Sequence, residues 1–472
     1  MTQAGQFRTE KDTMGELKVP ANAYYGANTQ RAVLNFPISD LRFPRSFIRA
    51  IGQVKLAAAQ VNNELGLLDK KLADAIVQAA NEVANGKLDD QFVVDIFQTG
   101  SGTSTNMNTN EVISNRAIEI LGGVRGSRKP VHPNDHVNIG QSSNDVIPTA
   151  TNLAAMTTIV HNLIPALEHL QKALEAKAEE FMPVVKTGRT HLQDATPVRL
   201  GQEFAGHAGQ IERGIQRIRH SMVSLCEIAL GGTAVGTGVN THLEFAGRVA
   251  KKLSALARVD VRETGNHFQA QSTLDSLVDT SGALKTVAVS LMKIANDIRW
   301  LGSGPRAGLG EIDLPAVQPG SSIMPGKVNP VIPESVCMVA AQVIGNDAAI
   351  TIAGQSGNFE INVMMPIAAY DLLQSIDILS TASRNLADQC IVGLKATRKG
   401  PDMVQNGLAI CTTLVPHIGY DASAAIAKEA QATGKSIREI AKVRTKFSDA
   451  ELDKILDAAS MTEPGLGGVS VG

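Results

Sequence analysis

The sequence has few aromatic residues and few charged ones, and each shortage narrows the class of protein. Aromatic residues occupy 4% of the 472 positions, although 43% of the positions are hydrophobic. A core filled by Ala, Val, Leu and Ile suits long packed helices better than aromatic-rich sheets. Charged residues make up 19% of the chain. So low a share predicts that much helix surface is hidden, for example between subunits.

Cysteine is also scarce. The four cysteines are widely spaced and form no CxxC pair, so we expect neither a zinc site nor a cysteine-held iron–sulfur cluster. We expect reduced thiols in a cytoplasmic protein. They are Cys226, Cys337, Cys390 and Cys411.

Signals for targeting, membranes and nucleic acids are lacking. Residues 1–12 are polar and lack the apolar run of a signal peptide. We find no uninterrupted apolar stretch long enough to span a bilayer. The 44 basic and 46 acidic residues give a net charge of −2, which favours neither nucleic-acid binding nor membrane-surface binding.

Long helical periodicity is what the sequence does contain. Apolar residues recur at spacings of three and four, which predicts seams for packing against other helices. Pro165 lies inside the first of these seams and should bend its helix locally. Such regular seams favour an elongated helical bundle, and we see no βαβ alternation. The seams lie in residues 152–177, 199–222 and 284–301.

Other segments complete the predicted organisation, and the length exceeds that of one usual core, so several domains are expected. Residues 46–65 and 70–85 carry helical patterns within a mixed N-terminal part. Residues 336–353 are apolar nearly all round, which predicts a helix buried on every side. Residues 392–472 read as a small helical domain that ends in a loose tail, residues 464–472.

Two polar stretches in the N-terminal part are candidate binding loops. Residues 99–110 combine hydroxyls, amides and glycines, which suit anion binding, although a turn before a helix is the commoner use. Residues 132–144 are also expected to form a loop. His132, Asp135 and His136 are conceivable metal ligands there, but capping and turn bonding explain most of such residues more often.

Two further polar stretches carry stronger signals. His191 lies among polar residues shortly before Pro197, in a loop or at a helix start, where it can titrate and reach a ligand. Residues 320–330 contain two glycines, two prolines and Lys327, and they precede the apolar helix. Packing explains the prolines but not a lysine in this position.

The last stretch, GSSIMPGKVNP, resembles the signature of the fumarase/aspartase superfamily. RTEKDTMGELKVP, SGTSTNMN, HPNDH, QSSND and GRTHLQDATP occur in the family's order, so the resemblance covers essentially the whole chain. It implies a mainly α fold of three domains: residues 1–142, mixed and mostly helical; 143–395, a central long-helix bundle; and 396–472, a small helical domain. It also implies a homotetramer with a shared twenty-helix core, whose active sites each take residues from three subunits.

Members of this superfamily eliminate a leaving group from succinyl-type substrates to give fumarate. Aspartate ammonia-lyases typically have glutamine at His191, threonine at Ser143 and alanine at Gly326, so these positions resemble the class II fumarases. The resemblance then implies reversible hydration of fumarate to L-malate in the tricarboxylic acid cycle, without a metal or other cofactor. An aspartate ammonia-lyase remains an alternative. A non-catalytic structural or dicarboxylate-binding relative, which would be expected to lose Ser321, His191 or Lys327, is another.

The resemblance also implies residue roles. Ser321 would take the C3 proton as an alkoxide, and His191 would act at C2, directly or through a water. Glu334 would orient and charge His191. Fixed donors would stabilise the aci-carboxylate intermediate. The implied substrate-binding residues are Ser101, Gly102, Thr103, Ser142, Ser143, Asn144, Thr190, Ser322, Lys327, Val328 and Asn329.

Fumarases of this class also have a second dicarboxylate site in the HPND loop. Lys129 stands where some relatives have arginine, so the charge is kept and the bidentate fork is lost. Tight binding is therefore not expected, and a purely structural role for the loop stays open. The implied residues are Lys129, His132, Pro133, Asn134 and Asp135.

Overall fold

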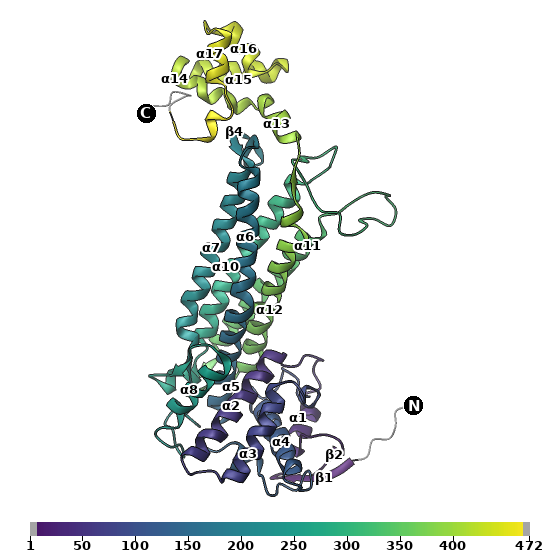
Figure 1. The fold of residues 1–472 in the computed structure, drawn as a ribbon, viewed down its shortest axis with the longest axis vertical. Coiled ribbons are helices and arrows are strands. Elements are labelled where there is room, and N and C mark those ends of the chain that lie inside the picture. Colours follow the sequence, from purple (N-terminus) through teal and green to yellow (C-terminus); the bar gives the residue numbers. More distant parts are fainter. Residues whose placement is uncertain (1–6, 466–472) are drawn as a thin grey trace. The chain divides into compact units, whose positions relative to one another are not determined.

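The computed structural model describes residues 7–465, and these residues are mainly helical (Figure 1). The described chain divides into two compact units. Unit 1 comprises the chain up to Pro165, Gly214–Ala288 and Val339–Ser380, and unit 2 comprises Ala166–Arg213, Val289–Met338 and the chain from Thr381. The predicted α class is confirmed, whereas the three domain boundaries stay a prediction.

Unit 1 is built on short and medium helices with small two-stranded sheets. Its apolar core includes Ile76 and Val83 of α3, which pack with Val112 and Ile118 of α4. The helices expected at residues 46–65 and 70–85 are confirmed as α2 and α3. Its elements are β1 (Phe7–Asp12), β2 (Gly15–Pro20), α1 (Ala27–Asn35), α2 (Arg45–Glu64), α3 (Lys70–Ala84), α4 (Thr103–Ile120), α5 (Ser143–Thr158), β5 (Glu227–Ile228), α8 (Phe245–Ala257), β6 (Arg262–Glu263), α9 (His267–Ser272), β8 (Gly357–Asn358) and β9 (Ile361–Asn362).

The expectation of a loop over residues 99–110 is wrong from Thr103 onward, because α4 begins there. Several polar side chains on the first turns of α4 are buried, and two of them donate hydrogen bonds to backbone carbonyls. Asn108 Nδ2 donates to the carbonyl of Gln91 at 2.9 Å, and Thr109 Oγ1 donates to that of Thr105 at 2.9 Å. These bonds explain how Asn108 and Thr109 can lie on a buried helix.

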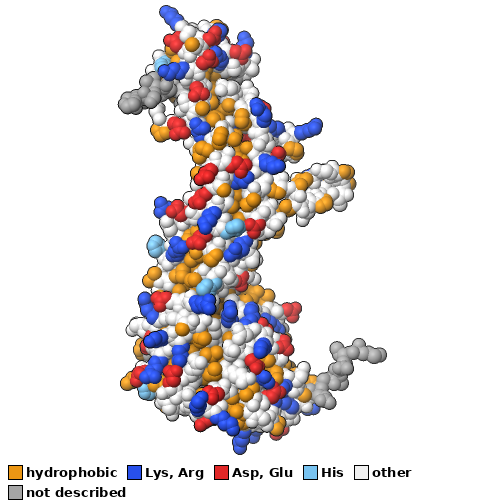
Figure 2. Space-filling view, in the orientation of Figure 1, with side chains coloured by type: hydrophobic (Ala, Val, Ile, Leu, Met, Phe, Trp, Pro, Cys, Tyr) orange, Lys and Arg blue, Asp and Glu red, His pale blue; other side chains and the backbone are white. Residues whose placement is uncertain are grey.

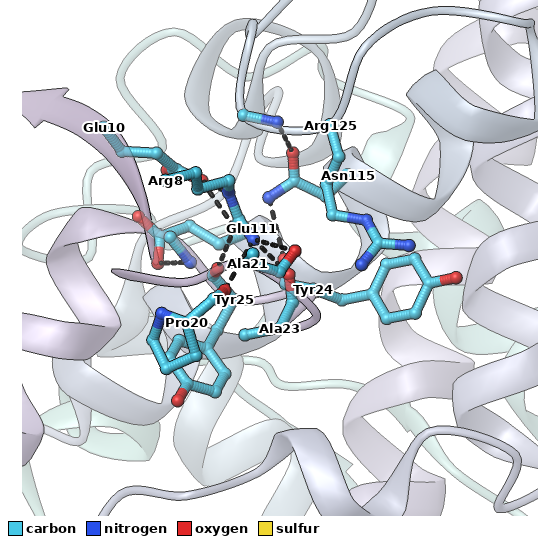
Figure 3. A network of polar contacts seen from close by, with 12 residues as sticks. Arg8, Glu10, Pro20, Ala21, Ala23, Tyr24, Tyr25, Glu111, Asn115 and Arg125 are labelled. Atoms are coloured by element: carbon cyan, nitrogen blue, oxygen red, sulfur yellow. Dashed lines mark hydrogen bonds and ion pairs between the residues drawn. The ribbon is translucent and has the colours of Figure 1, made fainter. Parts of the chain in front are cut away.

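The chain before α1 is tied down by two side chains (Figure 3). The Arg8 guanidinium on β1 donates to the carbonyls of Pro20, Ala21, Ala23 and Tyr25 at 2.7–3.1 Å. The buried carboxylate of Glu111 on α4 accepts the N–H groups of Gly26, Asn28 and Thr29. Glu111 thus caps α1, whose own N-cap Gly26 has no side chain to do so.

Unit 2 contains a β-hairpin and the C-terminal helices. The C-terminal helices share an apolar core that includes Leu414, Ile426, Ile440 and Leu452, which confirms a small helical region after residue 392. Most of the tail predicted at residues 464–472 lies outside the described residues. The elements are α6 (Ile164–Phe181), β3 (Val185–Thr190), β4 (Gln193–Arg199), β7 (Ile312–Asp313), β10 (Lys395–Ala396), α13 (Lys399–Met403), α14 (Val415–Ile418), α15 (Tyr420–Thr433), α16 (Ile437–Arg444) and α17 (Asp449–Ile455).

The boundary between the units falls within long helices, on which the predicted seams lie. In the first seam, a π-helical turn over Ile159–Leu163 lies between α5 and α6, shortly before Pro165, and the bend expected there stays a prediction. Proline offers no N–H to the preceding turn, and a π turn accommodates that gap in the helical ladder. The remaining long helices are α7 (Leu200–Leu225), α10 (Asp275–Leu301), α11 (Val331–Gly354) and α12 (Met365–Gln389).

Helix α11 departs from two expectations. It was expected to be buried on every side, but only 39% of its most apolar 18-residue window is buried within the described chain. It is also the one helix of residues 7–465 that is long and apolar enough to cross a membrane. Charges such as Glu334 and Asp347 interrupt the run, yet the mean hydropathy of the window remains 1.6. Core helices of soluble proteins meet the same criterion.

Candidate active site

In unit 1 the first two polar stretches meet at the start of two helices. The hydroxyl oxygens of Ser101 and Thr103 lie 2.8 Å apart, and those of Thr103 and Ser143 lie 2.7 Å apart, both at hydrogen-bond distance. Gly102 precedes α4 with a φ of +73°, and a Cβ there would lie 2.8 Å from Ile147. Unpaired N–H groups at helix starts favour anions, so the cluster can hold a carboxylate.

The start of α5 is fixed by a capping box. Ser142 Oγ accepts the N–H of Asn144 at 3.3 Å, and Asp145 Oδ1 accepts that of Ser142 at 2.9 Å. Asp145 Oδ2 also accepts the N–H groups of Gly231 and Thr233. Full burial raises the pKa of Asp145 to about 6, although these N–H donors favour the charged form. Asp145, which the sequence did not single out, thereby holds the backbone of Ser142, one of the predicted residues.

In unit 2, Thr190 and His191 lie at the tip of the β3–β4 hairpin, where Thr190 pairs with Gln193. His191 and Leu192 form its turn with φ of +57° and +60°. Positive φ at two successive residues is the geometry of tight hairpin turns, which side chains other than glycine adopt at a cost. His191 is exposed there, so the expected loop position is confirmed and a helix start is excluded.

A buried cluster of charged side chains stabilises the β3–β4 hairpin. Lys186 on β3 is 1% exposed, and its ammonium lies 2.8 Å from Glu203 and 3.2 Å from Glu311. Arg189 on the same strand lies 2.6 Å from Glu311. The sequence did not predict this cluster, because Arg189 and Glu311 are 122 positions apart and no motif links the two residues.

The loop that carries Ser321 is closed by its own backbone. The Gly320 N–H donates to the carbonyl of Lys327 at 2.9 Å, and Asn329 Nδ2 donates to that of Gly320 at 2.6 Å. Ser321 Oγ accepts the N–H groups of Ile323 and Met324 at 3.2 and 2.9 Å. Two N–H donors at one hydroxyl oxygen stabilise negative charge on that oxygen, which suits an alkoxide.

The other predicted residues of unit 2 lie on or beside this loop. Ser322, Lys327 and Val328 are exposed, and Glu334 lies in the first turn of α11. In the part of the chain that the structure describes, no hydrogen bond joins Ser321, His191 and Glu334. Within one chain, the described residues form the hydroxyl cluster in unit 1, and the hairpin tip and the closed loop in unit 2.

The HPNDH stretch forms a π-helical turn over Pro133–Val137. His132 Nδ1 accepts the N–H groups of Asn134 and Asp135, while His136 Nδ1 accepts the N–H of His132. Both rings therefore cap backbone groups, and burial is the main cause that lowers the pKa of His132. Residues 7–465 contain no group of three His, Cys, Asp or Glu that could hold a metal ion, and the observed bonds match the expected capping and turn bonding. Lys129 and Asn134 are exposed.

Comparison with known proteins identifies the class of enzyme to which this fold corresponds. Residues 15–345 match the family described as Lyase, and residues 410–463 match the one described as Fumarase C C-terminus. The crystal structure of recombinant class II fumarase from Schistosoma mansoni superposes with a TM-score of 0.95 at 40% identity, over 97% of this chain and 99% of that one. Fold and sequence together define a helical lyase.

Individual relatives narrow the class of enzyme from lyases to one family. Fumarate hydratase class II of Mesorhizobium japonicum is 51% identical, over 97% of this chain and 99% of its own length. The mitochondrial fumarate hydratase of Danio rerio is 53% identical, over 93% of this chain and 87% of its own. The chain belongs to the class II fumarate hydratase family. The superfamily predicted from the polar stretches is thereby confirmed, as is an enzyme of the lyase type.

Proposed function

We propose that this chain catalyses the reversible hydration of fumarate to L-malate, a step of the tricarboxylic acid cycle, with no metal or other cofactor. The observation that carries the proposal is the similarity to class II fumarate hydratases over 97% of the chain. The hydroxyl cluster of Ser101, Thr103 and Ser143 at two helix starts supports it, because a dicarboxylate needs donors of this kind. In the proposed site Gly102, Ser142, Asn144 and Thr190 also hold substrate.

In the dehydration direction, Ser321 as an alkoxide takes the C3 proton of malate, and the electron pair moves into the neighbouring carboxylate. Lys327 and Asn329, with the N–H groups of the loop at Ser322 and Val328, stabilise the resulting aci-carboxylate. The intermediate then expels hydroxide from C2, and His191 supplies the proton that turns the hydroxide into water, directly or through a bridging water. Glu334 orients His191 and favours its charged form.

A complete site would be shared between subunits of a homotetramer, with residues from three chains. Within the described residues no hydrogen bond joins Ser321, His191 and Glu334, which supports this arrangement. The exposed apolar side chains of α11 support it as well, because such surface is normally covered in a stable assembly.

Two further assignments belong to the proposal. The turn formed by Lys129, His132, Pro133, Asn134 and Asp135 is a candidate second dicarboxylate site, and its structural role as a capped turn is an equal alternative. The location is cytoplasmic. The matched relatives include bacterial class II enzymes and mitochondrial ones, so fractionation of the native cell would test the location directly.

One assay tests the activity. L-Malate added to the purified chain should raise the absorbance at the ultraviolet edge as fumarate forms, and EDTA should leave the rate unchanged. Ammonia from L-aspartate, without fumarate from malate, would instead identify an aspartate ammonia-lyase. Binding of both acids without turnover would identify a non-catalytic relative.

A substitution tests the proposed role of His191. His191→Asn should lower kcat by about 100-fold or more, the usual contribution of a general acid–base, while the oligomer stays intact in size-exclusion chromatography. The matched control is His169→Asn, because His169 is a partly exposed histidine of the same unit that pairs with Asp388 at 2.6 Å. Equal kcat in the two variants would remove His191 from the mechanism.

A further inference from the structure

A lysine ammonium is enclosed in unit 1, close to the hydroxyl cluster. Lys55 lies in the middle of α2 and is 0% exposed. Its Nζ donates to Asn138 Oδ1 at 2.9 Å and to Gln141 Oε1 at 3.0 Å. Burial of an ammonium costs several kcal/mol unless its donors are satisfied, so a lysine retained here requires a reason.

The two acceptors connect Lys55 to the helix that begins at Thr103. Asn138 Oδ1 also accepts from Asn106 Nδ2 at 3.3 Å and from Asn110 Nδ2 at 3.1 Å, and both asparagines lie on α4. Asn138 Nδ2 donates to the carbonyl of Gln141 at 3.0 Å. One amide thus joins α2, α4 and the segment that precedes α5.

The same network ends directly at the proposed substrate residues. Gln141 is the residue before Ser142, the N-cap of α5, and Gln141 Nε2 donates to the carbonyls of Val137 and Ile139. On the α5 side, Asp145 is also 0% exposed and fixes Ser142 from the other direction. The start of α5 is therefore held between two buried groups of opposite charge.

Two opposing influences act on the pKa of Lys55. Burial lowers the pKa of Lys55 to about 7, and the nearby carboxylate of Asp145 is the charged group that opposes this shift. The direct contacts of the Lys55 Nζ that fix its geometry are its hydrogen bonds to Asn138 and Gln141.

We propose that Lys55 is a positioning residue for substrate binding: through Asn138 and Gln141 it holds the start of α5 in the register at which the hydroxyls of Ser143 and Thr103 meet. This inference rests on the proposed function. Without the ammonium, Gln141 Oε1 loses its donor and Asn138 Oδ1 loses one of its three donors, while the buried Oδ1 atoms of Asn106 and Asn110 already lack a partner. The segment would then repack, and displacements of 1 Å at a binding group reduce its contribution steeply.

Lys55→Met of the full chain tests this role. We expect KM for both fumarate and L-malate to rise about 10-fold, with a parallel rise in the Kd of succinate, a non-reacting dicarboxylate, measured by calorimetry. We expect kcat to fall much less, because Ser321 and His191 lie on other elements. Lys55→Gln, which keeps N–H donors without the charge, should recover part of the affinity.

A matched variant separates positioning from stability alone. Lys177 is also buried, and its Nζ donates to the carbonyl of Leu394 and to Glu180 in unit 2. Lys177→Met should lower Tm and leave KM and the succinate Kd unchanged. If Lys55→Met shows this same pattern, Lys55 is structural only and the inference is overturned.

Two other outcomes are also decisive. If Lys55→Met yields no soluble protein, Gln141→Leu, which removes one acceptor and keeps the lysine, must raise KM and the succinate Kd, and unchanged values overturn the inference. If the wild-type chain turns over neither acid, the proposed function fails instead. The succinate Kd of the variants then still decides whether Lys55 positions the dicarboxylate site.

Discussion

Glu119 shows how one side chain gathers partners that a local motif does not indicate. Its carboxylate accepts from Tyr24 Oη at 2.7 Å, Arg116 Nη1 at 2.5 Å and Arg125 Nη2 at 2.9 Å. The Arg125 guanidinium also lies 3.9 Å from the centre of the Tyr24 ring (Figure 3). The hydrogen bond from Tyr24, followed by those from the two arginines, lowers the pKa of Glu119 to about 2.

This shift predicts a pH-dependent stability contribution. The folded pKa of Glu119 lies below the ordinary value of 4.5, so its contribution is complete above about pH 4.5 and is lost as pH falls toward 2. After discounting for the 39% exposure of its side chain, we expect Glu119→Gln to cost about 1–2 kcal/mol at pH 7. Urea unfolding at pH 7 and pH 3 should show the difference shrinking at the lower pH.

Glu360→Gln is the control for this series, because Glu360 is an exposed carboxylate in the turn between β8 and β9. Its free energy of unfolding should follow the wild type at both pH values. A cost of Glu119→Gln that stays constant between pH 7 and pH 3 would contradict the assigned pKa.

Residues with local signatures could be predicted from the sequence, and those with distant partners could not. Ser321, Lys327 and His191 lie in polar stretches that the packing of a hydrophobic core does not explain. The order of these stretches along the chain therefore indicated a family and a site. Lys55 appeared to be one helical residue among many. Its partners lie more than 80 positions away, and only the folded chain shows that a lysine is fully buried there.

Among the elements, helices were predicted well because their apolar periodicity extends over many residues, as in α7 and α10. The β3–β4 hairpin was not, because its strands are short, polar and interrupted by a register shift between Thr187 and Arg189. Alternation cannot show where a strand packs over an ion cluster rather than an apolar core. The start of α4 was likewise hidden by its polar composition.

The ion cluster beneath the hairpin predicts a strong effect of Glu311→Ala. The variant leaves Arg189 without its carboxylate and Lys186 with Glu203 alone. A broken buried ion pair costs about 3–5 kcal/mol, and we expect the lower end because Glu203 remains. Chemical denaturation should show this loss, and kcat should fall with it because the hairpin carries His191.

Asp194→Ala provides the comparison on the facing strand, since Asp194 is exposed at the same hairpin. It should change the free energy of unfolding by less than about 1 kcal/mol. Similar costs for the two variants would mean that Glu311 does not support the hairpin.

The closed loop predicts that Gly320 tolerates no side chain. A Cβ at Gly320 would lie 2.3 Å from the carbonyl oxygen of Lys327 and 2.8 Å from the backbone nitrogen of Asn329. Gly320→Ala should open the loop and lower kcat by about 100-fold, the scale of a 1 Å misplacement, with little change in Tm because the loop is exposed. Gly265→Ala, where a Cβ meets nothing within 4 Å, should retain wild-type kcat.

At the scale of the whole molecule, the low share of charged residues and the exposed apolar side chains of α11 both favour the proposed assembly of several chains. Met338 and Ile352 of α11 are 68% and 53% exposed, and hydrophobic side chains lie between charged ones along the long helices (Figure 2). The sequence predicted complete burial of α11, and the single chain does not provide it. In the proposed tetramer, neighbouring subunits would cover the exposed face of α11, which would account for the apolar composition that predicted its burial.

Met338→Glu therefore tests the proposed tetramer. Light scattering of the wild type should give four times the chain mass of 49.8 kDa. A charge placed in an apolar interface costs several kcal/mol, so the variant should dissociate into smaller species at micromolar concentration. Its fumarase activity should fall with the tetramer fraction if active sites are shared. Val443→Glu, at a 79% exposed position of α16, should keep both mass and activity; a Met338→Glu variant that also kept both would place the subunit interface elsewhere.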